Sequence, residues 1–115
     1  MNELIPEKFR DDEEIIRLTI EQVKKDFGTH FPELHFSGEK NKIYEELTLQ
    51  VEAAITAIRK SNPVLFKVIL YRVDISERDA SAALRQQSLF TLSEKIIQRE
   101  FQKVLIKRFF SGNAG

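Results

Sequence analysis

VLFKVILYRVDI, residues 64–75, is the stretch that decides the fold, because nine of its twelve residues are apolar. If the stretch is helical, its apolar side chains cover roughly two-thirds of the circumference and leave Lys67 and Asp74 on the narrow remaining side. Such a helix has to be surrounded by the other helices of the chain or by a second copy. We therefore expect one nearly fully buried central helix here.

The residues before this stretch favour a helix over a strand. Asn62 suits a helix N-cap, and Pro63 suits the first helical position. A buried strand is the competing interpretation, because valine and isoleucine are abundant and the run is short. A strand needs partners, however, and no other segment of the chain alternates polar and apolar residues. The sequence therefore predicts a helix over residues 64–73.

Composition restricts the class of protein. The 115 residues, 42% hydrophobic and 31% charged, are typical of one globular domain over residues 1–115. The absence of cysteine excludes disulfides, iron–sulfur clusters and thiolate zinc sites. No apolar run approaches the roughly 18 to 20 residues that span a bilayer, and the acidic beginning lacks the pattern of a secretory signal. We expect a cytoplasmic protein with no membrane partner.

Four further segments have helical patterns, so the predicted fold is all-α. Long helices are expected over residues 12–27, 39–60 and 91–110, and a short one over residues 76–85. Short loops between them favour antiparallel neighbours. The expected architecture is a small helical bundle of the four-helix type around the buried helix at residues 64–75.

Capping residues indicate where these helices begin and end. Ser37 is a candidate cap for the second helix, and Ser76 for the short one. Thr91 and Glu94 have the spacing of a capping box and predict the beginning of the last helix. The Ser-Gly pair at residues 111–112 predicts its end.

One short segment resembles known sequences. Residues 70–77, LYRVDISE, resemble a stretch in a small family of uncharacterised bacterial helical proteins. The resemblance covers eight residues. It implies helical character and no activity.

Sequence motifs give no sign of catalysis. The chain has no phosphate-binding loop, dinucleotide-binding motif, zinc-protease motif, nucleophile elbow or EF-hand loop. His30, Glu33 and His35 carry metal-ligating groups, but their spacing matches no common site, and we interpret them as a surface loop. We therefore expect no enzyme, no cofactor and no metal site.

Arg72 is the strongest candidate for binding a small ligand. It falls within the apolar arc of the predicted helix, where an isolated charge has to be paired or reach solvent. Together with Tyr71 or Tyr44 it could hold a phosphate or carboxylate. The competing interpretation, which we favour, is an internal ion pair with Asp74, Glu77 or a carboxylate of another helix.

Four basic residues recur along the last helix. Lys95, Arg99, Lys103 and Lys107 follow one another at intervals of four and could contact a nucleic-acid backbone. The zero net charge of the chain argues against nucleic acid as a partner. The alternative is a solvated face whose charges meet carboxylates of neighbouring helices, for example those of residues 11–14.

Several apolar residues are candidates for an interface between chains. They fall outside the main apolar faces or near the C-terminus: Leu49, Leu92, Ile96, Phe109 and Phe110. Our principal hypothesis rests on these apolar residues, on the zero net charge, and on the large apolar surface of residues 64–75 that has to be buried. It is a noncatalytic protein–protein interaction module that self-associates as a dimer. The alternatives are an anionic-ligand regulator using Arg72, binding of an unknown protein, and weak nucleic-acid binding.

Overall fold

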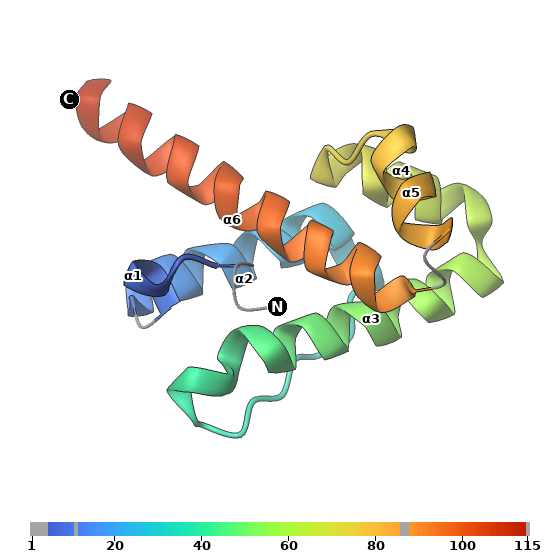
Figure 1. Cartoon of the computed structure of the whole chain (residues 1–115), viewed down its shortest axis with the longest axis horizontal. Helices are drawn as coiled ribbons and strands as arrows, with labels where there is room; N and C mark the ends of the chain where they lie inside the picture. The colour runs from blue at the N-terminus through green and yellow to red at the C-terminus, as the bar shows by residue number, and fades with distance from the viewer. Residues whose placement is uncertain (1–4, 11, 86–87, 115) are drawn as a thin grey trace.

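The computed structural model describes residues 5–10, 12–85 and 88–114, with the side chains of residues 7 and 110–114 outside the description. Within these residues the chain is entirely helical apart from its loops, which confirms the all-α bundle (Figure 1). The helices share one apolar core. Their order is α1 (Glu7–Arg10), α2 (Glu13–Phe27), η1 (Gly28–His30), η2 (Lys40–Lys42), α3 (Ile43–Ser61), α4 (Pro63–Val73), α5 (Glu77–Arg85) and α6 (Leu89–Ala114).

The central helix of the bundle is α6. It packs against α2, α3, α4 and α5 and crosses the whole molecule before its C-terminal end extends past the other helices (Figure 1). Its core face consists of side chains that are almost completely buried: Leu92, Ile96, Ile97, Glu100, Phe101 and Val104. The expectation that residues 64–75 supply the central helix is therefore wrong.

Helix α4 is buried on one side only. Phe66, Ile69, Leu70 and Val73 lie in the core. On the opposite side, the fractional exposure is 72% at Val64, 38% at Val68 and 84% at Tyr71. The prediction of nearly complete burial fails because α4 lies at one end of the bundle, where no helix of the described residues covers its outer side (Figure 1).

The ends of α4 follow the sequence prediction. The Asn62 side chain accepts a hydrogen bond from the Leu65 amide at 3.1 Å, and Pro63 occupies the first turn. At the other end, Asp74 has a left-handed backbone with φ of 75°, and its amide donates to the Leu70 carbonyl. This conformation ends the helix and turns the chain into α5, which Ser76 caps through the Asp79 amide.

Helix α6 begins earlier and ends later than expected. Ser88, rather than Thr91, caps it, since the Ser88 hydroxyl oxygen accepts from the Thr91 amide at 2.9 Å. The helix also continues through Gly112 to Ala114, so the predicted end at residues 111–112 is wrong. A glycine weakens a helix by only about 1 kcal/mol, which does not necessarily end one.

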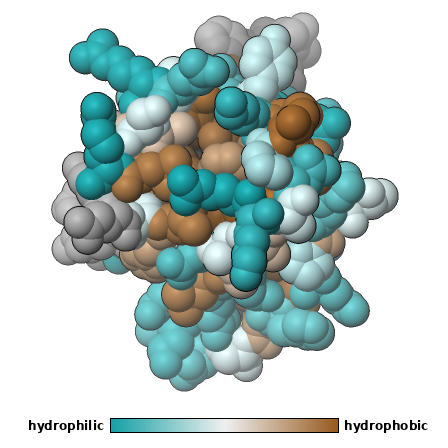
Figure 2. All heavy atoms as spheres, turned by 90° about the vertical axis from the view of Figure 1, so that its right-hand side faces the viewer, coloured by the Kyte–Doolittle hydropathy of each residue, from teal (hydrophilic) through white to brown (hydrophobic). Residues whose placement is uncertain are grey.

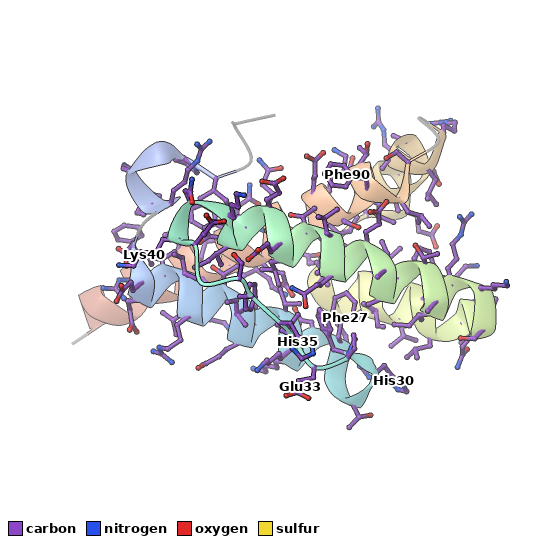
Figure 3. The ribbon with its side chains drawn as sticks, turned by 90° about the horizontal axis from the view of Figure 1, so that it is seen from below. Phe27, His30, Glu33, His35, Lys40 and Phe90 are labelled. Carbon is purple, nitrogen blue, oxygen red and sulfur yellow. The ribbon has the colours of Figure 1, made fainter. Side chains whose placement is uncertain are left out.

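The loop between α2 and α3 is attached to α3. Gln50 donates from its side chain to the His35 carbonyl and accepts from the His35 amide, at 2.9 and 2.8 Å. Helix α3 begins at Ile43 rather than near residue 39, and Ser37 does not cap it. His30, Glu33 and His35 are exposed in the segment that follows α2 (Figure 3), and within the described residues they form no group that could hold a metal ion.

Candidate functional site

The most unusual surface of the molecule is the outer side of α4. Val64, Val68 and Tyr71 follow one another at intervals of four and three, so they form one stripe along the helix. We call these three residues the α4 ridge. Isolated exposed apolar residues are ordinary, but an aligned set on one helix is typical of a surface that packs against another helix.

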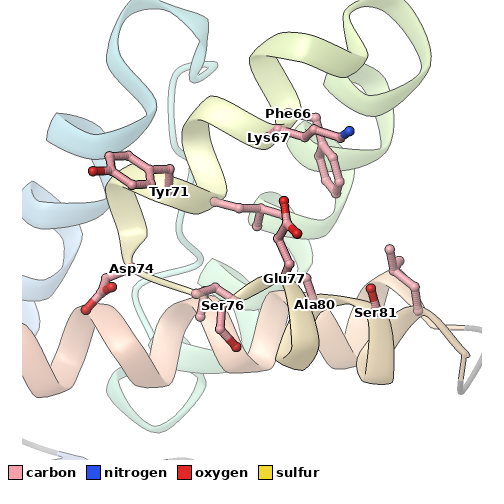
Figure 4. A pocket seen from close by; sticks show the side chains of 11 residues that line it. Phe66, Lys67, Tyr71, Asp74, Ser76, Glu77, Ala80 and Ser81 are labelled. Carbon is pink, nitrogen blue, oxygen red and sulfur yellow. The ribbon is translucent and has the colours of Figure 1, made fainter.

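A groove of about 480 Å³ lies beside the α4 ridge, between α4 and α5 (Figure 4). Its apolar lining comes from both helices and from the turn between them: Phe66, Leu70, Tyr71, Ile75, Ala80 and Leu84. Apolar side chains also gather in a hollow on this end of the molecule, surrounded by hydrophilic ones (Figure 2). The ridge and the groove together form an apolar surface with a polar rim, as many protein interfaces do.

Charged side chains of both signs border this surface. Lys67 lies at one end of the groove and Asp74 at the other, and Glu77 extends from α5 toward α4 between them (Figure 4). Arg99 of α6 donates to Asp74 Oδ2 at 2.6 Å, while 70% of the Asp74 side chain remains exposed. The rim therefore carries a basic side chain at one end of the groove and an acidic side chain at the other.

The three residues expected to bind an anion do not form one site. Arg72 donates from Nη1 to the Asp26 carbonyl at 3.4 Å, near the C-terminal end of α2. Tyr71 is exposed on the α4 ridge. Tyr44 is on α3, where burial raises the pKa of its hydroxyl to about 12. The charge of Asp12 adds to this increase in pKa, and the Thr19 side chain opposes it. Arg72 thus contacts a backbone carbonyl rather than one of the carboxylates expected to pair with it.

The basic residues of the last helix are largely occupied within the chain. Arg99 pairs with Asp74, and Lys107 donates to Gln22 Oε1 at 2.9 Å. Lys103 Nζ lies 2.5 Å from an Asp26 carboxylate oxygen. The partners are residues of α2 and the α4–α5 turn rather than residues 11–14. Two of the four basic residues, Arg99 and Lys103, are thus paired with carboxylates, which lowers the charge that the stripe offers to nucleic acid.

A buried charge cluster joins α2 to α6. It consists of Asp26, Glu100 and Lys103, with Lys103 Nζ 2.9 Å from Glu100 Oε1. Burial and the neighbouring Asp26 raise the pKa of Glu100 to about 9, although Lys103 opposes the shift. Burial alone would raise the pKa of Asp26, but Glu100 and Lys103 stabilise its charged form and lower it. Glu100 is therefore protonated at neutral pH and Asp26 is ionised.

This cluster has the groups for proton transfer, but they lie between α2 and α6 with little or no exposure. Glu100 is completely buried. A second groove lies between α2 and α6 and is lined by residues that include Leu18 and Val104. Asp26, Glu100 and Lys103 line neither this groove nor the α4–α5 groove. The cluster is therefore best understood as a polar contact that fixes α6 against α2.

The predicted interface residues divide into two groups. Leu92 and Ile96 are completely buried in the core, so the prediction that they face another chain is wrong. Helix α6 packs against α2, α3, α4 and α5, which supply the neighbours that the sequence did not reveal. Leu49 and Phe109 are half-exposed, at 50% and 59%, but on different helices. The Phe110 side chain lies outside the described residues.

The exposure of Val64 and Val68, which were expected in a nearly fully buried helix, and the complete burial of Glu100 were not predicted from the sequence. A signal for Glu100 was present, since it follows Ile96 by four residues and Ile97 by three, on the apolar face of α6. No comparable signal distinguishes Val64 from Leu70, because both belong to the same apolar run.

Comparison with family models, with curated proteins and with solved structures finds no match for this chain. Within the part of the chain that the structure describes, no three His, Asp or Glu side chains gather as a metal ion would require. No described helix combines the length and the apolar content needed to cross a bilayer.

Proposed function

We propose that this protein is a noncatalytic interaction module that self-associates as a dimer through the α4 ridge. The observation that carries the proposal is the exposure of Val64 and Tyr71, at 72% and 84%, on a helix whose other side is core. Covering such side chains removes apolar area from water, which is favourable by about 25 cal/mol for each Å².

The arrangement of α5 and α6 accounts for why the described residues leave the α4 ridge uncovered. Helix α5 packs on α6 and leaves the α4–α5 groove open, and the C-terminal end of α6 extends in the opposite direction (Figure 1). A second copy carries the same unpartnered surface, so a twofold pair satisfies both copies at once. One three-turn helix makes a small interface, so we expect a weak dimer.

Light scattering or sedimentation equilibrium over a concentration series tests the proposal. We expect the natural chain to reach a dimer at about 100 µM, whereas the double variant Val64→Ser/Tyr71→Ser stays monomeric because each substitution removes roughly 1 to 2 kcal/mol of interfacial burial. Both positions are exposed, so the monomer keeps its fold. The matched control is Leu49→Ser/Phe109→Ser, at exposed positions of α3 and α6, which should dimerise like the natural chain. A natural chain that remains monomeric contradicts the proposal.

The other functional hypotheses receive less support from the geometry. An anion site would need Arg72 to converge with Tyr71 or Tyr44. Arg72 donates instead to the Asp26 carbonyl. Tyr71 is exposed on the α4 ridge, and Tyr44 lies near Thr19 and Asp12. Nucleic-acid binding would need free cations, and Arg99 and Lys103 already have carboxylate partners. Lys67, Asp74 and Glu77 line the α4–α5 groove, but among the described contacts no hydrogen bond joins them, and we propose no enzymatic activity.

A further inference from the structure

We infer that the α4 ridge packs against the α4 ridge of a second copy with the two helices antiparallel, placing Lys67 of each copy beside the partner's Asp74. This inference rests on the proposed self-association and adds the direction of the helices and their polar contacts.

The spacing of the α4 ridge supports helix-on-helix packing. Val64, Val68 and Tyr71 have the alternating intervals of four and three that characterise the contact line between two side-by-side helices. In the antiparallel register that brings Lys67 toward the partner's Asp74, Val68 lies opposite the partner's Tyr71. Val64 then lies beside the C-terminal end of the partner's α4.

The charges beside the ridge determine the direction. Lys67 lies within α4 and Asp74 directly follows its last residue, so they lie at opposite ends of the α4–α5 groove and about 10 Å apart along the helix axis (Figure 4). In a parallel pair each would lie near the identical residue of the second copy, which is repulsive. In an antiparallel pair, Lys67 lies near the partner's Asp74, and the twofold axis makes this contact twice.

Self-complementarity of this kind favours a second copy over an unrelated helix. Asp74 can take part although Arg99 binds its Oδ2, because 70% of its side chain is exposed. Glu77 adds a second carboxylate on the same side of the surface. The basic and acidic ends of one copy thus match the acidic and basic ends of the next.

Engineered cysteines test the direction, and the natural chain has no cysteine to interfere. A mixture of Val68→Cys and Tyr71→Cys chains should form a disulfide-linked heterodimer under mild oxidation, detected by mass spectrometry with one chain isotope-labelled. Val64→Cys alone should remain unlinked, because its two copies lie at opposite ends of an antiparallel contact. Rapid linkage of Val64→Cys would show a parallel pair and overturn the inference.

A double-mutant cycle tests the ion pairs. Lys67→Met and Asp74→Asn should each weaken the dimer by about 3- to 10-fold, and the double variant should weaken it no further than either single change. Asparagine tolerates the left-handed backbone at position 74. Lys24→Met, at an exposed lysine of α2, is the control and should leave the affinity unchanged. Fully multiplicative effects of the two changes would overturn the Lys67–Asp74 contact.

These outcomes separate the inference from the proposed function. A natural chain that is monomeric at every concentration removes the proposed function itself. A chain that dimerises, loses dimerisation on Val64→Ser/Tyr71→Ser, but fails to form the Val68–Tyr71 cross-link keeps the proposed function and overturns only the antiparallel arrangement.

Discussion

Helices α4 and α6 reverse the relation expected between apolar content and burial. The α4 segment is the most apolar of the chain, yet Val64 and Tyr71 are largely in water. Helix α6 carries a basic residue at every fourth position from 95 to 107, yet it forms the centre of the core. The number of neighbours that the topology provides, rather than the apolar content of a helix, decides how much of it is buried.

The two helices also differ in whether their exceptional side chains, the cations of α6 and the exposed apolar residues of α4, have partners within the chain. Two cations of α6 are neutralised within the chain, Lys103 by Asp26 and Arg99 by Asp74. The exposed apolar side chains of α4 are not covered by the residues that the structure describes. We therefore assign the structural role to α6, and the proposed function would give the interaction role to α4.

The largest expected change in the free energy of unfolding comes from truncating a core side chain of α6. Ile96→Ala should lower the free energy of unfolding by about 2 to 4 kcal/mol, because it leaves a cavity in a fully buried site. Val64→Ala in α4 should change it by less than about 0.5 kcal/mol. Urea unfolding of the dilute protein measures both values. Equal losses at the two sites would contradict the assignment of core and surface.

Removal of the buried cation should have the next largest effect. Lys103→Met deprives the ionised Asp26 of its counterion and should cost about 2 to 4 kcal/mol of unfolding free energy. Lys67→Met, on the exposed side of α4, should be nearly neutral at a concentration where the chain is monomeric. The same urea titration compares them. A neutral Lys103→Met would show that the buried cluster does not hold α6 to α2.

Glu100 should make stability depend on pH. Its pKa is about 9 in the folded chain and near 4.5 when unfolded, so the folded state retains a proton that the unfolded state loses. Stability should therefore fall as pH rises from about 5 to about 9, with a slope of up to about 1.4 kcal/mol per pH unit from this residue. Asp26, with its lowered pKa, acts in the opposite sense and loses its contribution only in acid.

Glu100→Gln isolates this dependence. The substitution keeps a neutral side chain of similar shape and should flatten the fall in stability between pH 5 and pH 9, measured by thermal unfolding in matched buffers. Glu94→Gln, on the same helix but only half-buried, is the control and should retain most of the slope. An unchanged slope in Glu100→Gln would contradict a protonated Glu100.

Sequence patterns predict the local structure here better than the burial. The cap at Asn62 and the helix that follows are local features, and both are confirmed. The central position of α6 depends on contacts such as that between Asp26 and Lys103, 77 residues apart, which no periodicity reveals. The sequence also could not distinguish the exposed side of α4 from its buried side, because that difference depends on contacts between distant parts of the chain. The α4–α5 groove depends on how two helices meet and was not predicted at all.

The smallest effect concerns the beginning of α6. Ser88→Ala should cost about 1 kcal/mol of unfolding free energy, because the Thr91 amide loses its side-chain acceptor. Thr91→Ala, at the residue that the sequence pattern favoured as the cap, should cost less. Thermal unfolding of the two variants decides between the positions, and a larger loss for Thr91→Ala would place the cap there instead.

The most direct test of the account uses the two tyrosines of the chain. Hydroxyl-radical labelling of the natural protein over a concentration series reports the exposure of Tyr71, on the α4 ridge, and of Tyr44, whose hydroxyl is buried. We predict that Tyr71 reacts readily in dilute protein and becomes protected as the concentration rises, while Tyr44 reacts slowly throughout. Labelling of Tyr71 that is independent of concentration, or slower than that of Tyr44, would contradict the account.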